Sequence, residues 1–167
     1  ALLQMMGDDA RARQLLDRAL KIYEQNYGSN NVWSAPTMIS LAILLQKLGD
    51  YNGAQRLFER ALGIREHALG PKHPDVAESL SYLGGLAEAA GDLAKARQLY
   101  ESALSIREQT LGEAHPAVAM NLNGLGFLLQ TIGDHEGARP IYQRALAINE
   151  QKRGPTHPEV ARVLGNL

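Results

Sequence analysis

A 42-residue repeat is the feature that most constrains how this chain can fold. Residues 71–112 align without a gap on residues 113–154 and are identical at 19 of 42 positions. A Gly-Asp pair also recurs at this period, at Gly7-Asp8, Gly49-Asp50, Gly91-Asp92 and Gly133-Asp134. A fixed period of about 20–50 residues is typical of repeat proteins, whose neighbouring units share one continuous core. The sequence therefore predicts a single array over residues 1–167, with a partial repeat at 1–28, whole repeats at 29–70, 71–112 and 113–154, and a partial repeat at 155–167.

Each whole repeat predicts two helices joined by the Gly-Asp turn. In residues 71–112 the first helix, about 76–90, carries Val76, Leu80, Leu83 and Ala87 at the three- and four-residue steps of one buried face. Asp92 is expected to cap the second helix. Gly28 is likewise expected to end the helix of the first partial repeat in a left-handed conformation. Since no segment has the alternating pattern of a strand, the expected fold class is all-α.

Three positions depart from the regular pattern. Pro36 delays the first helix of residues 29–70, which is expected to begin near Ser34 and to end at Leu48. Trp33 lies in the preceding loop, where we expect it to pack over the preceding helix. Pro140 predicts a kink, or a helix that begins only after Gly137. Gly84 and Gly126 lie inside helices, and we expect them to permit the close approach of a neighbouring helix.

Composition and charge exclude several classes of function. The formal net charge of -1 argues against a nucleic-acid partner, which requires a clustered basic surface. No apolar run approaches the roughly 18 residues of a membrane span, so no membrane partner is expected. The absence of cysteine fits a reducing compartment, and we therefore expect a cytoplasmic location.

The recurring histidines offer no metal centre. His73, His115 and His157 occupy one repeat position, and equivalent residues of stacked repeats, whose helices pack about 8–10 Å apart, lie too far apart to share a metal ion. Each histidine precedes a proline and is expected to cap a helix. Arg65-Glu66 and Arg107-Glu108 are expected to be solvated or to pair between repeats. We expect no enzyme activity, metal or cofactor.

The spacing of small and large residues resembles the tetratricopeptide repeat. The residues that carry this resemblance are Leu83-Gly84, Ala87, Gly91, Ala96, Tyr100 and Ala103, with their counterparts in the flanking repeats. The usual period is 34 residues, and the longer form, with its LGPKHPDVA and LGEAHPAVA linkers, is similar to that of kinesin light chain. The resemblance implies a right-handed α-solenoid of stacked antiparallel helix pairs. HEAT and armadillo arrays have a similar period but do not account for the Gly-Asp turn.

The resemblance also implies that the first helix of each pair lines a concave binding groove. The residues expected to line it are Ile39, Ile43, Gln46, Lys47, Ser81, Gly85, Glu88, Asn123, Phe127 and Gln130, and Ala89, Thr131, Arg162 and Gly165 extend this wall. The set contains large apolar groups and amides but lacks the clustered lysines and arginines of a carboxylate clamp. An extended peptide with apolar anchors is therefore the expected ligand.

Three functions follow from such a surface. The first is an adaptor or scaffold module that binds a protein or peptide partner in the groove. The second is a structural or regulatory array that packs on another part of its own parent chain. The third is self-association through ends that lack a polar cap, by Leu2, Leu3, Met5 and Met6 on one side and Val163, Leu164 and Leu167 on the other.

Overall fold

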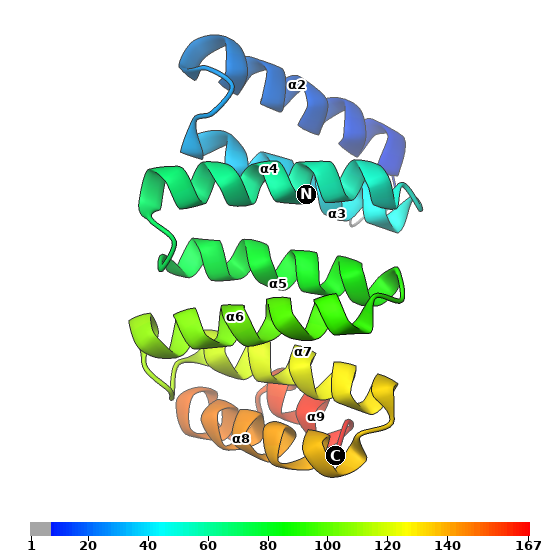
Figure 1. Ribbon diagram of the computed structural model, residues 1–167, viewed down its shortest axis with the longest axis vertical. Coiled ribbons are helices and arrows are strands. Elements are labelled where there is room, and N and C mark those ends of the chain that lie inside the picture. The colour runs from blue at the N-terminus through cyan, green and yellow to red at the C-terminus, as the bar shows by residue number, and fades with distance from the viewer. Residues whose placement is uncertain (1–7) are drawn as a thin grey trace. The chain divides into compact units, whose positions relative to one another are not determined.

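The computed structural model describes residues 8–167, which form helices joined by short turns (Figure 1). In chain order the described elements are α2 (Asp9–Tyr27), the 3-10 turn η1 (Val32–Ser34), α3 (Ala35–Lys47), α4 (Tyr51–Leu69), α5 (Pro74–Ala89), α6 (Leu93–Leu111), α7 (Pro116–Ile132), α8 (His135–Arg153) and α9 (Pro158–Leu164). No strand occurs in this range, and the predicted all-α class is confirmed. No helix within residues 8–167 is both long and apolar enough to cross a membrane.

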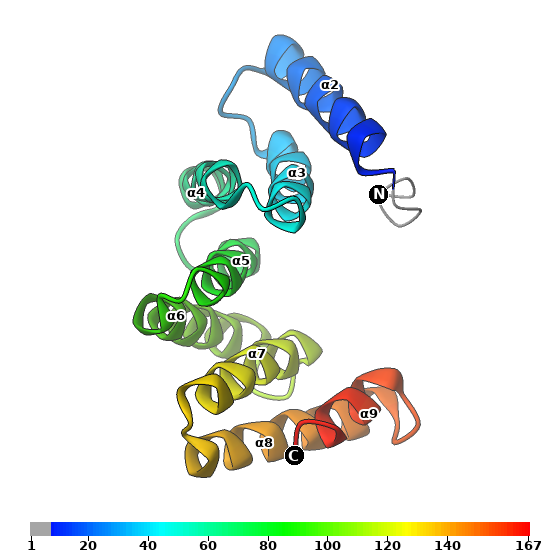
Figure 2. The same ribbon diagram turned by 90° about the vertical axis from the view of Figure 1, so that its right-hand side faces the viewer.

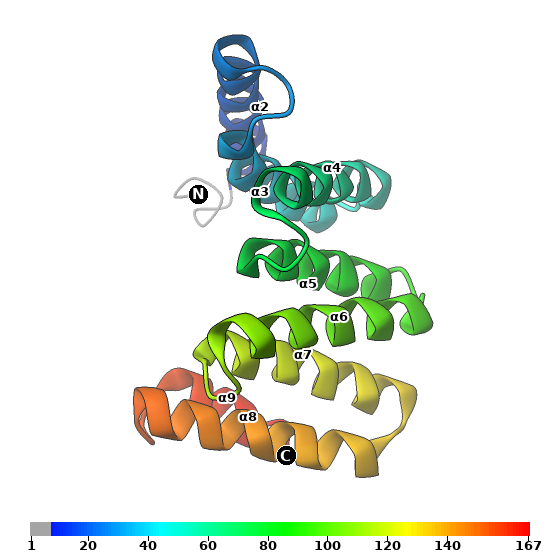
Figure 3. The ribbon, with the colours of Figure 1, turned by 60° about the vertical axis from the view of Figure 1, so that its left-hand side comes forward.

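The chain forms two compact units, Ala1–Leu86 and Ala87–Leu167. In the first unit, α3 and α4 form a helical hairpin and α3 also contacts α2 (Figure 2). In the second unit, α7 and α8 form the corresponding hairpin, while α6 packs on α7 and α9 packs on α8 (Figure 3). The core of this unit lies between the hairpin helices, where Leu122, Leu128 and Tyr142 are buried.

Short polar side chains begin the helices, as predicted. Asp92 Oδ1 accepts a hydrogen bond from the Lys95 backbone N–H at 3.1 Å, and Asp50 and Asp134 make the same contact in their own repeats. The recurring histidines are also caps. The Nδ1 atoms of His73, His115 and His157 each accept the backbone N–H two residues further along, at 3.1 Å. Because these ring nitrogens satisfy helix-terminal donors, the cap interpretation is confirmed.

Two predicted details of helix ends differ in the structure. Gly28 ends α2 with the expected positive φ of 83°, but its ψ of 163° is extended rather than left-handed helical, in a region that only glycine occupies readily. Its backbone N–H donates to Glu24 O at 2.9 Å and so still caps the helix. The delayed start predicted from Pro140 is wrong, because α8 begins at His135 and includes the proline.

The predicted packing of Trp33 is also wrong, because this side chain is 69% exposed. The helix that follows does begin late, at Ala35, as predicted. Two polar contacts hold the preceding loop: Asn31 Nδ2 donates to Tyr23 O at 3.3 Å, and Ser34 Oγ donates to Asn31 O at 2.7 Å. Ser34 is fully buried by this arrangement, and Trp33 points outward instead.

Candidate partner-binding surface

In the first unit, the predicted surface residues lie on α3 and α5 at different depths. Ile39 is buried, whereas Ile43 is 36% exposed. Lys47 is exposed, and its Nζ contacts Asp9 Oδ1 of α2 at 2.8 Å. Gln46, Ser81 and Gly85 are half-buried. Ile43 and Lys47 are therefore the predicted residues of this unit that are most available to a partner.

In the second unit, Phe127 is the predicted large apolar residue that is exposed, at 54% of its surface. Glu88 and Gln130 are half-buried, and Asn123 is buried despite its polar side chain. Burial of a phenyl ring is favourable by roughly 1.5–3 kcal/mol. An exposed phenylalanine in the middle of a helix, with the exposed Met120 seven residues earlier, thus marks a surface that a ligand can cover.

One side of α7 carries a stripe of residues, of which the sequence predicted only Phe127 and Thr131 as part of the binding surface. It consists of Met120, Gly124, Phe127 and Thr131, which follow one another at four- and three-residue steps. We call these four residues the α7 stripe. Met120, which is 55% exposed, and Gly124 were not predicted as site residues. Helical periodicity counted backwards from Phe127 would have identified both.

The amide side chains beside this stripe are bonded within the chain. Gln130 Oε1 accepts the Tyr142 hydroxyl at 2.9 Å, and Gln130 Nε2 donates to Asn166 O at 2.8 Å. The side-chain amides of Asn166 and Asn123 also lie 3.3 Å apart. Asn123 and Gln130 therefore fix α7 against α8 and the residues that follow α9. Apolar contact is left as the main chemistry of the stripe.

Glu88 occupies the repeat position of Gln130 and makes the equivalent contact. The Tyr100 hydroxyl donates to Glu88 Oε2 at 3.1 Å, but Glu88 Oε1 is buried without a hydrogen-bond partner. Burial raises the pKa of the Glu88 carboxyl, although the Tyr100 hydrogen bond opposes this. Burial, and then the charge of Glu88, also raises the pKa of Tyr142, whereas Arg162 opposes the rise.

We expect Glu88→Gln to make stability less dependent on pH. Because the folded-state pKa of Glu88 lies above its ordinary value, its contribution to stability is fully present at acid pH and is lost as pH rises through the folded-state pKa. The neutral amide removes this loss, so the variant should gain at most about 1 kcal/mol at pH 7 and nothing at pH 4, since Glu88 is only partly buried. Urea unfolding at both pH values measures this, with the exposed Glu113→Gln as control. An equal shift at both pH values would contradict the assignment.

The sequence did not predict that two arginines would be buried. Arg65 and Arg107 are each 5% exposed. Arg65 Nη1 bonds Ser79 Oγ at 2.9 Å and Arg107 Nη1 bonds Asn121 Oδ1 at 2.8 Å, in each case across to the following helix. The solvated interpretation is therefore wrong for both arginines, and the inter-repeat interpretation is confirmed. The signal available in the sequence is the polar residue 14 positions after each arginine.

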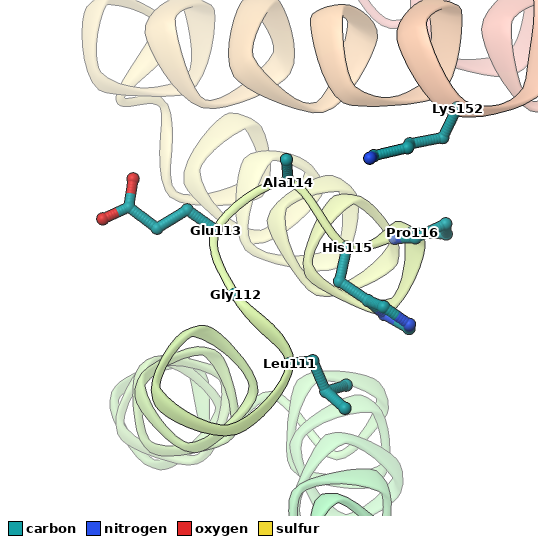
Figure 4. A pocket seen from close by; sticks show the side chains of 7 residues that line it. All are labelled: Leu111, Gly112, Glu113, Ala114, His115, Pro116 and Lys152. Atoms are coloured by element: carbon teal, nitrogen blue, oxygen red, sulfur yellow. The ribbon is translucent and has the colours of Figure 1, made fainter.

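A separate pocket of about 480 Å³ lies at the loop between α6 and α7. It is lined by Leu111, Gly112, Glu113, Ala114, His115, Pro116 and Lys152. Figure 4 shows that the Lys152 amine enters from α8, whereas the His115 ring lies on the other side, towards Leu111. His115 Nδ1 already accepts a hydrogen bond from the Ala117 backbone N–H. The pocket thus presents no set of polar groups that converge on one ligand atom.

The residues expected at uncapped ends are only partly described. Leu164 and Leu167 are 54% and 51% exposed, but Val163 is fully buried. Leu2, Leu3, Met5 and Met6 lie outside the described residues. Self-association through these ends therefore stays a prediction. The cytoplasmic location of the protein also stays a prediction.

Helical hairpins that share buried packing residues at a fixed period define a helical repeat protein. The tetratricopeptide repeat family profile matches residues 1–67, 33–109, 75–151 and 117–167, and the chain therefore belongs to this family. A comparison with curated proteins gave no match. Tetratricopeptide repeats generally mediate protein–protein interactions, and proteins of this kind are typically non-enzymatic scaffolds.

Solved structures confirm the likeness to kinesin light chain repeats. BtubC (BKLC) from P. vanneervenii is 27% identical, with a TM-score of 0.75, over 99% of this chain and 64% of its own. A Podosopora anserina protein with kinesin light chain-like TPR repeats is 24% identical to this chain, with a TM-score of 0.76. The match covers 98% of this chain and 81% of that protein. A variant of that protein is 23% identical, with a TM-score of 0.77. The Podosopora structures share the fold, and this chain spans less than two thirds of BtubC.

Proposed function

We propose that this chain is a protein-interaction module that holds an extended peptide segment of a partner against the exposed stripe of α7. The observation that carries this proposal is the exposure of Phe127, together with Met120 seven residues earlier on the same helix face. Ile43 and Lys47 offer a similar surface on α3 of the first unit. The internally bonded amides of Asn123 and Gln130 support the proposal, because a surface fixed before binding loses less conformational entropy when a ligand attaches.

We expect Phe127→Ala to weaken peptide binding at least tenfold, which corresponds to about 1.4 kcal/mol. Because half of the ring is already exposed, the change in folding stability should be small. Peptides selected from a random 12-residue phage library against residues 1–167 serve as the probe, and fluorescence polarisation gives their affinities. Ile132→Ala is the matched control, since Ile132 is a similarly exposed apolar residue at the end of α7 but lies off the stripe.

Two results would overturn the proposal. One is that no peptide is selected, and the other is that the selected peptides bind Phe127→Ala as tightly as the unchanged chain. Either result would favour the alternative of an array that packs on its own parent chain.

A further inference from the structure

We propose that Gly124 leaves a notch over the ring of Tyr100 which accepts one aromatic side chain of the bound peptide. This inference rests on the proposed function and names the chemistry of the anchor residue. The notch lies within the α7 stripe, between Met120 four residues before and Phe127 three residues after. Side chains at these spacings flank one another on a helix surface, so Met120 and Phe127 form its two walls.

The floor of the notch is the Tyr100 ring of α6. A Cβ atom placed on Gly124 would lie 3.4 Å from Tyr100 Cε1, 3.5 Å from Cζ and 3.8 Å from Cδ1, which are its three nearest atoms. These are ordinary van der Waals distances, so a side chain at this point would rest on the ring without a clash. The hydrogen bond from the Tyr100 hydroxyl to Glu88 Oε2 holds the ring in place.

The first unit shows how such a notch is filled. The residue 42 positions before Gly124 is Tyr82, and the residue 42 positions before Tyr100 is Phe58. Tyr82 stacks on Phe58 with ring centroids 5.5 Å apart and an interplanar angle of 3°. Phe58 is 0% exposed, whereas Tyr100 keeps 8% of its surface exposed. An aromatic ring therefore fits this position of the repeat, and Gly124 places no side chain there.

The size of the surface favours a peptide over a second copy of the chain. Met120 and Phe127 are each about half exposed, and together they offer roughly 200 Å² of apolar area, against about 800 Å² per partner in a stable protein interface. One anchor side chain on an extended segment suits an area of this size. Stacking on Tyr100 then favours an aromatic anchor over an aliphatic one.

The test is to fill the notch with a side chain of the protein itself. Gly124→Tyr should place a ring on Tyr100 as Tyr82 does on Phe58, and we expect it to weaken the phage-selected peptides at least tenfold. Gly63→Tyr is the matched control, because Gly63 lies on α4 with nothing within 4 Å of its Cβ position, and it should bind within twofold of the unchanged chain. Gly124→Ala, whose methyl group fits at ordinary contact distance, provides a second variant that keeps the fold. It should weaken binding by a smaller factor.

The sequences of the selected peptides provide an independent test of the aromatic anchor. We expect them to share an aromatic residue whose replacement by alanine weakens binding at least tenfold, and by leucine to a lesser extent. If Phe127→Ala abolishes binding while Gly124→Tyr and Gly124→Ala leave it unchanged, the notch is wrong and the interaction surface stands. If selected peptides lack an aromatic residue, the notch is also wrong. If no variant of the stripe alters binding, both proposals fail.

Discussion

Replacing Arg107 with alanine is expected to lower the free energy of unfolding by about 3 kcal/mol. The guanidinium is buried, and its Nη1 lies 2.8 Å from Asn121 Oδ1 and 3.4 Å from Ala117 O. Asn121 Nδ2 continues the network to Tyr100 O at 2.8 Å. Alanine leaves a cavity where the long side chain lay, and it removes a charged donor from the buried Asn121 Oδ1 and from Ala117 O. Both effects act in the same direction.

Urea unfolding measured by circular dichroism tests this expectation. Arg97→Ala is the control, since the Arg97–Glu101 pair is exposed on both sides and should change stability by less than about 0.5 kcal/mol. The double variant Arg107→Met with Asn121→Leu replaces both polar partners by apolar groups, and we expect it to be more stable than Arg107→Ala. If Arg107→Ala lay within about 0.5 kcal/mol of the unchanged chain, the buried network would have no stabilising role.

The helices could be predicted from the sequence because the repeat marks their ends with residues of fixed chemistry. Proline is favoured in the first turn of a helix, and aspartate after glycine supplies a cap, so the helix starts that carry these residues were specified locally. Pro140 is the exception, because it lies inside α8. The direction of Trp33 could not be predicted in this way. It depends on hydrogen bonds that Asn31 and Ser34 make within an irregular loop, and no periodic pattern describes such a loop.

The surface residues were harder to predict than the helices. Neighbouring positions on a helix point about 100° apart, so a small error in helix rotation exchanges a surface residue for a buried one. Ile39 and Asn123 were predicted to face the groove but are buried, whereas Phe127 is exposed. The burial of Arg65 and Arg107 could not be predicted for another reason. Arginine near a helix end is usually solvated, and burial of Arg65 depends on Ser79 of the next helix, which only the fold brings into contact.

Gly126→Ala is expected to destabilise the chain by about 2 kcal/mol, although alanine is the better helix former. The predicted reason for this glycine, the close approach of a neighbouring helix, is confirmed through the ring of Tyr142. A Cβ on Gly126 would lie 2.8 Å from Tyr142 Cε1 and 2.9 Å from Cζ, and both distances are too short for carbon atoms. The ring is almost fully buried, and its hydroxyl is bonded to Gln130, so it cannot move aside without breaking that contact.

The same substitution at Gly63 should have the opposite sign. No atom lies within 4 Å of a Cβ at that position, so Gly63→Ala should stabilise α4 by about 1 kcal/mol through helix propensity alone. Thermal and urea unfolding of the two variants give a comparison in which the change of residue is identical and only the surroundings differ. Tyr142→Leu in the Gly126→Ala background should recover part of the loss, because it removes the ring that the methyl group meets. If Gly126→Ala were as stable as Gly63→Ala, Tyr142 would have room to yield, and close packing would not explain why glycine stands at this position.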